Sequence, residues 1–148
     1  MDKIKLFTIG FTKKTAEQFF NLIQKAGVKR VIDIRLNNNS QLAGFSKRDD
    51  LRYFLKLICN IEYVHMPTLA PTQDMLDEYK KRKGDWALYE KKFLELISSR
   101  KIEDSLSKDV LKSSCLLCSE DKPHHCHRRL VAEYLNQKWG NFEINHLS

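Results

Sequence analysis

The sequence alternates short runs rich in β-branched and aromatic residues with longer runs of helical periodicity. This alternation restricts the fold most, because consecutive parallel strands need a crossover, usually a helix, between them. The clearest helical run covers residues 15–27, where Thr15 and Gln18 form a capping box and Gly27 follows the last turn. Strands are expected at residues 5–10, 29–35, 62–67, 113–118 and 142–147.

The remaining helices are expected to begin at Ser46, Thr72 and Asp85 and close to Cys126. The sequence contains no internal repeat, low-complexity segment or linker, so residues 1–148 are predicted to form one domain. The predicted fold class is α/β. We expect a single-domain three-layer sandwich, with a mainly parallel sheet of about five strands and helices on both faces.

The net charge of +7 permits an anionic partner, such as a nucleotide or a nucleic acid, without requiring one. Many of the basic residues lie within residues 78–92, where acidic residues are interleaved, as on an ordinary solvated helix face. Trp86, Tyr89 and Phe93 recur there at helical spacing. This spacing favours a place in the core over a base-stacking platform.

No apolar run approaches the ~20 residues that a membrane span needs, and the N-terminal residues do not resemble a signal peptide. We therefore expect a cytoplasmic protein without a membrane partner. In that reducing compartment the four cysteines are expected to be thiols, metal ligands or nucleophiles rather than disulfides. No cofactor is predicted, and the oligomeric state is left open.

Polar residues follow the expected strands at their carboxyl ends, which is where open parallel sheets bind ligands. They come from distant parts of the chain and should meet at one edge of the sheet. Several also have structural interpretations: Asp33 can pair with Arg35 or accept bonds from a loop, and His65 can bond to a carbonyl. The candidate residues are Gly10, Thr12, Asp33, Arg35, His65, Cys118, Glu120, Cys126, His127 and Arg128.

Cys115 and Cys118 have the C-x-x-C spacing of many zinc sites. The two leucines between them favour a strand, however, and strand residues three apart point to opposite faces. A thioredoxin-type redox pair is disfavoured too, because these cysteines end a strand instead of beginning a helix. We therefore expect Cys115 in the core and no metal. The residues that could otherwise complete a zinc site are Cys126 and one of His124, His125 and His127.

A cysteine nucleophile fits the expected elements better. Cys118 would end a strand, and Cys126 would lie near a helix N-terminus, where backbone N–H groups favour a thiolate or an anion. His127 is a candidate base beside them, and Glu120 or His65 could transfer protons. Two arginines, Arg35 and Arg128, could hold an anionic substrate.

The chain also resembles a known family. The most specific feature is a C-x-E…C-H-R pattern at residues 118–128, supported by "TIG" at the end of the first strand and "DIR" at the end of the second. With these motifs residues 8–147 resemble the domain-of-unknown-function family DUF488. The resemblance implies a small α/β protein whose cysteine motif suggests an enzyme without an agreed reaction. Residues 36–45 ("LNNNSQLAGF") and the "TLAPTQ" segment depart from the common pattern, and both border the expected site.

The leading hypothesis is an enzyme that acts on a nucleotide or a nucleic-acid-derived anionic substrate. An alternative is a non-catalytic module that binds a nucleotide or a nucleic acid, and a third possibility is a zinc-binding protein. The expected catalytic residues are Cys118, Glu120, Cys126, His127 and His65. The expected substrate-binding residues are Gly10, Thr12, Asp33, Arg35 and Arg128.

Overall fold

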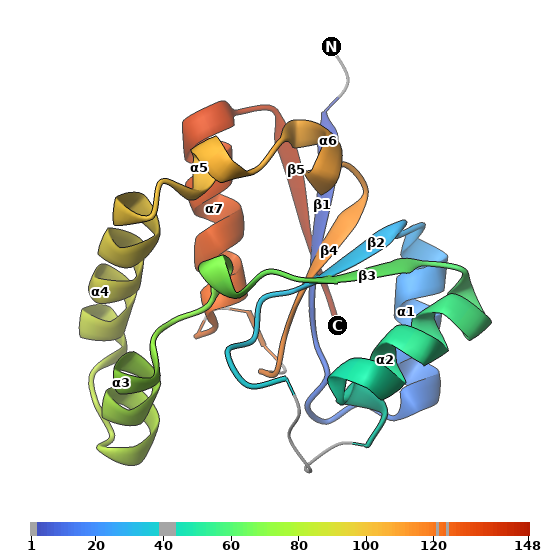
Figure 1. Cartoon of the computed structure of the whole chain (residues 1–148), viewed down its shortest axis with the longest axis horizontal. Coiled ribbons are helices and arrows are strands. Elements are labelled where there is room, and N and C mark those ends of the chain that lie inside the picture. Colours follow the sequence, from blue (N-terminus) through green and yellow to red (C-terminus); the bar gives the residue numbers. More distant parts are fainter. Residues whose placement is uncertain (1–2, 39–43, 121, 124) are drawn as a thin grey trace.

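The computed structural model describes residues 3–38, 44–120, 122–123 and 125–148. Within them, a parallel sheet with the strand order β3-β2-β4-β1-β5 forms the middle layer (Figure 1). The α/β fold predicted from the alternating pattern is confirmed. The strands are β1 (Ile4–Gly10), β2 (Arg30–Asp33), β3 (Glu62–His65), β4 (Ser114–Cys118) and β5 (Phe142–Leu147).

Helices cover both faces of the sheet. On one face, α1 (Ala16–Ala26) and α2 (Arg48–Phe54) pack their apolar residues against Phe7, Ile9 and Leu117. On the other face, α4 (Trp86–Ser99) and α7 (His127–Trp139) pack against alternate strand residues, among them Leu6, Ile32 and Leu116. The short helices α3 (Gln73–Leu76), α5 (Ile102–Ser105) and α6 (Lys108–Leu111) lie between β3 and β4 in the sequence.

The caps of α1 agree with the sequence. The Thr15 hydroxyl accepts from the backbone N–H of Gln18, the Gln18 side chain accepts from the N–H of Thr15, and Gly27 adopts a φ of 78°. The predicted cap of α2 is wrong. Ser46 is buried and belongs to a 3₁₀ turn, Gly44–Ser46, so the residue that precedes the helix is Lys47.

The second strand ends at Asp33, two residues earlier than expected. The reason is local: the backbone N–H of Arg35 donates to the Asp33 carboxylate at 3.1 Å, which turns the chain out of the strand. Of the polar loop expected at residues 36–45, residues 39–43 lie outside the described part of the chain.

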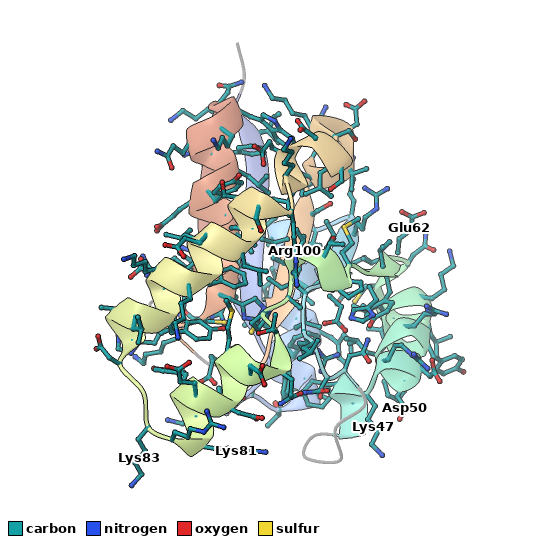
Figure 2. The ribbon with its side chains drawn as sticks, turned by 60° about the vertical axis from the view of Figure 1, so that its left-hand side comes forward. Lys47, Asp50, Glu62, Lys81, Lys83 and Arg100 are labelled. Atoms are coloured by element: carbon teal, nitrogen blue, oxygen red, sulfur yellow. The ribbon has the colours of Figure 1, made fainter. Side chains whose placement is uncertain are left out.

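Arg100, at the C-terminal end of α4, fixes this helix to the segment between β3 and α3 (Figure 2). Its Nη1 atom donates to the carbonyl oxygens of Thr68 and Ala70 at 2.8 and 2.7 Å. The aromatic side chains of α4 are thereby held beside the carboxyl edge of the sheet.

The position of β4 creates a crevice. It lies between β1 and β2, whose connections run to the face of α1 and α2, whereas its own connection runs to α7 on the opposite face. Ligands of open α/β sheets bind where neighbouring connections diverge in this way. In the ranges that the structure describes, no helix has the length and apolar character needed to cross a membrane.

Candidate functional site

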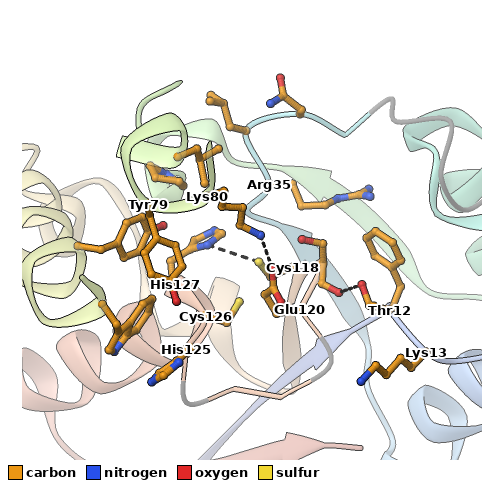
Figure 3. Close-up of a pocket in the computed structure, with 18 of the residues that line it drawn as sticks. Thr12, Lys13, Arg35, Tyr79, Lys80, Cys118, Glu120, His125, Cys126 and His127 are labelled. Carbon is orange, nitrogen blue, oxygen red and sulfur yellow. Dashed lines mark hydrogen bonds and ion pairs between the residues drawn. The ribbon is translucent and has the colours of Figure 1, made fainter. Parts of the chain in front are cut away.

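A cavity of about 640 Å³ opens at the carboxyl ends of β1, β2 and β4 (Figure 3). Its walls come from these strand ends, from α3 and the π-helical turn Asp77–Lys81 that extends it, from α4 and from the start of α7. Cys118, Glu120, Cys126 and His127 all line it, as does Arg35. These five residues therefore lie together at one edge of the sheet, as expected from the sequence.

The most direct contact in the cavity wall joins Cys118, the last residue of β4, to His127, the first residue of α7. The Cys118 Sγ atom lies 3.4 Å from the Nδ1 atom of His127. The Nε2 atom of His127 lies 2.8 Å from the carbonyl oxygen of Ile34, just after β2. A carbonyl can only accept a hydrogen bond, so Nε2 carries a proton and Nδ1 faces the sulfur.

Burial alone would raise the pKa of Cys118, but a hydrogen bond from Cys126 and the positive charges of His127 and Arg128 hold this pKa well below its ordinary value. Burial lowers the pKa of His127, and the charge of Cys118 outweighs this effect and raises it. Burial and the bond to Cys118 raise the pKa of Cys126. These directions favour the thiolate form of Cys118 and the imidazolium form of His127, and they favour the neutral thiol form of Cys126.

Arg128 lies behind the cavity instead of in its wall. Its side chain is fully buried, its Nη1 atom donates to the Glu120 carbonyl oxygen at 2.5 Å, and its Nε atom donates to the Thr8 hydroxyl at 3.2 Å. The Thr8 hydroxyl also bonds to the Nδ1 atom of His146 at 2.6 Å. Arg128 thus holds the chain after β4, and its charge acts on Cys118 without touching the cavity.

Gly10 and Thr12 connect the end of β1 to the same segment. A Cβ atom on Gly10 would lie 1.5 Å from the Glu120 carbonyl oxygen and 2.8 Å from the Arg128 Nη1 atom, so a side chain cannot fit there. Thr12 lines the cavity, and both its hydroxyl and its backbone N–H donate to the carbonyl oxygen of Ser119, at 2.5 and 3.0 Å.

The Asp33 carboxylate binds the side chain of Arg35. The fully buried Asp33 carboxylate accepts from the Arg35 Nε and Nη2 atoms at 2.9 and 2.8 Å and from the Tyr63 hydroxyl. Burial lowers the pKa of Arg35, but the bond to Asp33 outweighs this and raises it. His65 bonds through Nε2 to the Arg35 carbonyl oxygen at 2.9 Å and is not among the described residues that line the cavity. Asp33 therefore contacts the Arg35 guanidinium, and His65 contacts the Arg35 backbone.

The cavity also has an aromatic wall. Trp86 stacks on Tyr89 with ring centroids 5.1 Å apart and on His125 at 4.9 Å, and Tyr79 packs against Tyr89 at 5.1 Å. Phe93 is fully buried in the core, as the helical spacing predicts. The expectation for Trp86 and Tyr89 was incomplete, because they pack against the core and line the cavity as well.

Cys118, Cys126 and His127 could also hold a metal ion, since their ligand atoms all lie within 4.8 Å of one another. Two cysteines and one histidine are ligands that suit zinc. Cys115 lies in the core on the opposite face of the sheet, as expected, so the Cys115–Cys118 spacing does not form a zinc site. His124 lies outside the described residues, and His125 stacks on Trp86.

A family model described as "Domain of unknown function DUF488" matches residues 15–135. The chain belongs to the DUF488 family. No curated protein and no solved structure matches this chain. The DUF488 match contains the whole C-x-E…C-H-R pattern, whereas Gly10 and Thr12 precede it.

Sequence reasoning missed several wall residues of this DUF488 protein. Lys80 forms an ion pair with Glu120, and both line the cavity. Leu76 and Tyr79 line it as well, so three residues at helical spacing i, i+3 and i+4 share one face. That spacing was the available signal, and the surrounding run of charges obscured it. Lys13, after β1, was also missed.

Proposed function

We propose that this protein is an enzyme in which Cys118 is the nucleophile and His127 is its acid–base partner. The observation that supports this most directly is the 3.4 Å contact between the Cys118 Sγ and His127 Nδ1 atoms on the wall of a cavity. The thiolate is the nucleophilic form of cysteine, and a neighbouring imidazolium stabilises it. The lowered pKa of Cys118 and the raised pKa of His127 agree with such a pair.

The chemistry follows from this pair. The Cys118 thiolate attacks an electrophilic carbon of the substrate, and a covalent bond to sulfur forms as the bond to the leaving group breaks. His127 gives its Nδ1 proton to the leaving group. Water then attacks the same carbon, His127 takes a proton from it, and Cys118 leaves again as a thiolate. Glu120, held by Lys80 on the same wall, is available to orient that water.

The surroundings favour an anionic substrate that carries a planar ring, as a nucleotide or a nucleic-acid fragment does. Lys13, Arg35 and Lys80 bring positive charge to the cavity, and Tyr79, Trp86 and Tyr89 bring aromatic surface. The volume of about 640 Å³ falls within the range typical of small-molecule sites. We also propose a cytoplasmic location, where Cys118 and Cys126 remain thiols.

The same cationic wall also favours a second function, a non-catalytic module that binds nucleotides or nucleic acid. In that case the ligand would bind without forming a bond to sulfur. Affinity would fall steeply with salt, because each phosphate contact releases counterions. Replacement of Cys118 by alanine would leave this affinity unchanged.

The test uses a panel of nucleoside 5′-phosphates and short single-stranded oligonucleotides. Each is assayed for protection of Cys118 against iodoacetamide, for turnover and for a covalent adduct in the intact mass. The enzyme hypothesis expects protection of Cys118 in the original chain and in a Cys59→Ala control, and it expects turnover that this control keeps and the Cys118→Ala variant loses. Protection without turnover or adduct would favour the binding module. Turnover that survives in the Cys118→Ala variant would exclude Cys118 as the nucleophile.

A further inference from the structure

Cys126 has no part in the bond-forming steps proposed above, yet it lies beside the nucleophile. The sulfur atoms of the two residues lie within 4.8 Å of each other, and the Cys118 sulfur lies 3.4 Å from the Nδ1 atom of His127. Both side chains are almost fully buried, and both line the cavity. Two buried thiols this close together, beside a histidine and on the wall of a cavity, are arranged so that oxidation can join them in a disulfide.

We propose that Cys118 and Cys126 are a site of reversible oxidation, in which a hydroperoxide that enters the cavity converts them to a disulfide. Cys118 is the thiol that reacts with the peroxide, and Cys126 is the thiol that resolves the product. The proposal shares with the proposed function only Cys118 as the residue that reacts.

With hydrogen peroxide as the oxidant, the steps balance. The Cys118 thiolate attacks one peroxide oxygen, the O–O bond breaks, and the departing hydroxide takes the His127 Nδ1 proton to become water. Cys118 is then a sulfenic acid. The Cys126 sulfur attacks the Cys118 sulfur, an S–S bond forms, the S–O bond breaks and a second water leaves. Two thiols lose two electrons, and one peroxide becomes two waters. A thiol reductant such as dithiothreitol restores both cysteines.

The fold favours this pairing over other pairs of cysteines. A disulfide needs an S–S distance of about 2.05 Å, so the two sulfur atoms must approach. Cys118 is fixed in β4, whereas Cys126 precedes α7 and lies outside regular structure, so Cys126 is the residue that moves. Cys115 lies on the opposite face of the sheet, and Cys59 ends the π-helical turn after α2.

Oxidation would also remove the nucleophile. In the disulfide, Cys118 has no thiolate charge to raise the pKa of His127, and its sulfur cannot attack a substrate. Turnover should therefore stop on oxidation and return on reduction.

The test uses the full chain, reduced, treated with a chelator and confirmed by elemental analysis to be metal-free. It is then exposed to hydrogen peroxide at equimolar concentration. We expect the intact mass to fall by two hydrogen atoms, about 2 Da, in a form that dithiothreitol reverses. Peptide mapping after alkylation under denaturing conditions should link Cys118 to Cys126 and find Cys59 and Cys115 alkylated. A link to any other cysteine, a link between two chains, or a Cys118 sulfinic acid without a link would overturn the proposal.

Variants assign the two roles. Cys126→Ser should stop at the sulfenic acid, which dimedone labels at Cys118, whereas Cys118→Ser should give neither product. Cys59→Ser is the matched control and should form the link as the original chain does. Peptide mapping of the original chain decides the question even where a variant fails to fold. A disulfide without turnover of any substrate would keep this inference and remove the proposed enzyme, and turnover without a disulfide would do the reverse.

Discussion

His127 directs its Nδ1 atom to the Cys118 sulfur at 3.4 Å and its Nε2 atom to the Ile34 carbonyl oxygen at 2.8 Å. The second contact fixes which nitrogen faces the sulfur, because only a protonated Nε2 can donate to the carbonyl. The histidine comes from α7 and the cysteine from β4, but the segment after β2 orients the ring. Three elements therefore determine the geometry of one cysteine–histidine pair.

The first prediction concerns the pH dependence of Cys118 alkylation. The folded-state pKa of Cys118 is lowered and that of His127 is raised, so the ion pair exists in the window between them. Alkylation by iodoacetamide should stay fast well below the ordinary thiol pKa and slow only as the pH falls through the folded-state pKa. In a His127→Gln variant, which lacks the cation, the profile should shift upward by about one pH unit or more.

Cys59 provides the internal reference for this measurement. Burial raises its pKa, so its alkylation rate should rise only at alkaline pH. Mass spectrometry of each cysteine peptide after timed alkylation gives both profiles in one sample. Identical profiles for Cys118 and Cys59 would contradict the thiolate assignment.

The buried ion pair below the cavity should matter for stability. Replacing Asp33 by alanine leaves the Arg35 guanidinium buried and unpaired, and we expect a loss of about 3–5 kcal/mol in the free energy of unfolding. Glu62→Ala is the matched control, because Glu62 pairs with Arg30 at the exposed end of β3 and should cost less than about 1 kcal/mol. Urea denaturation measures both, and equal losses would rule out the proposed difference.

A side chain on Gly10 should disturb the segment after β4. Gly10→Ala places a Cβ atom 1.5 Å from the Glu120 carbonyl oxygen, so we expect a loss of about 1–3 kcal/mol in stability and slower Cys118 alkylation. At Gly44 an added Cβ atom meets no described atom within 4 Å, so Gly44→Ala should leave both quantities close to those of the original chain. Thermal unfolding and the alkylation rate test this together. A Gly10→Ala chain that behaves like the Gly44 control would refute the close approach.

Lys80 should contribute to anion binding, whereas its neighbour should not. Lys80 lines the cavity beside Glu120, and Lys81 points away from the molecule (Figure 2) and pairs with Asp77. For the nucleotide that protects Cys118, Lys80→Met should weaken binding about tenfold, or about 1.4 kcal/mol, and reduce its salt dependence. Lys81→Met should leave the affinity within about twofold. Titration calorimetry at two salt concentrations separates these outcomes, and equal effects would remove Lys80 from the site.

The sequence predicted the fold because its local signals and its global pattern agree. Thr15, Gln18 and Gly27 mark the ends of α1 correctly, and the alternating pattern requires a parallel sheet. The cap of α2 was wrong since Ser46, although a good capping residue, is used in a 3₁₀ turn. Short helices such as α5 and α6 were not predicted because four residues carry too little periodicity.

The site was predicted less completely, because chain position does not fix where a side chain points. Arg128 and Asp33 are at the expected edge, but both turn inward and hold other groups instead of facing the cavity. His65 likewise bonds to a backbone carbonyl. Lys80, by contrast, looked like part of a solvated helix face, and only the packing of α3 beside the sheet brings it to Glu120. The spacing of Leu76, Tyr79 and Lys80 indicates a shared helix face, but a single sequence does not show which part of the molecule that face meets.

The central place of β4 has a consequence for folding. Its neighbours β1 and β2 are synthesised much earlier, and the contacts that complete the site span 93 residues between Ile34 and His127 and 120 residues between Thr8 and Arg128. Contacts between such distant residues form late and slowly. A nascent chain that lacks β4 and α7 has β1 and β2 but no reactive cysteine pair. Cys118 therefore becomes reactive only once β4 has paired with β1 and β2. The rate at which its alkylation appears during refolding can therefore report the last step of folding.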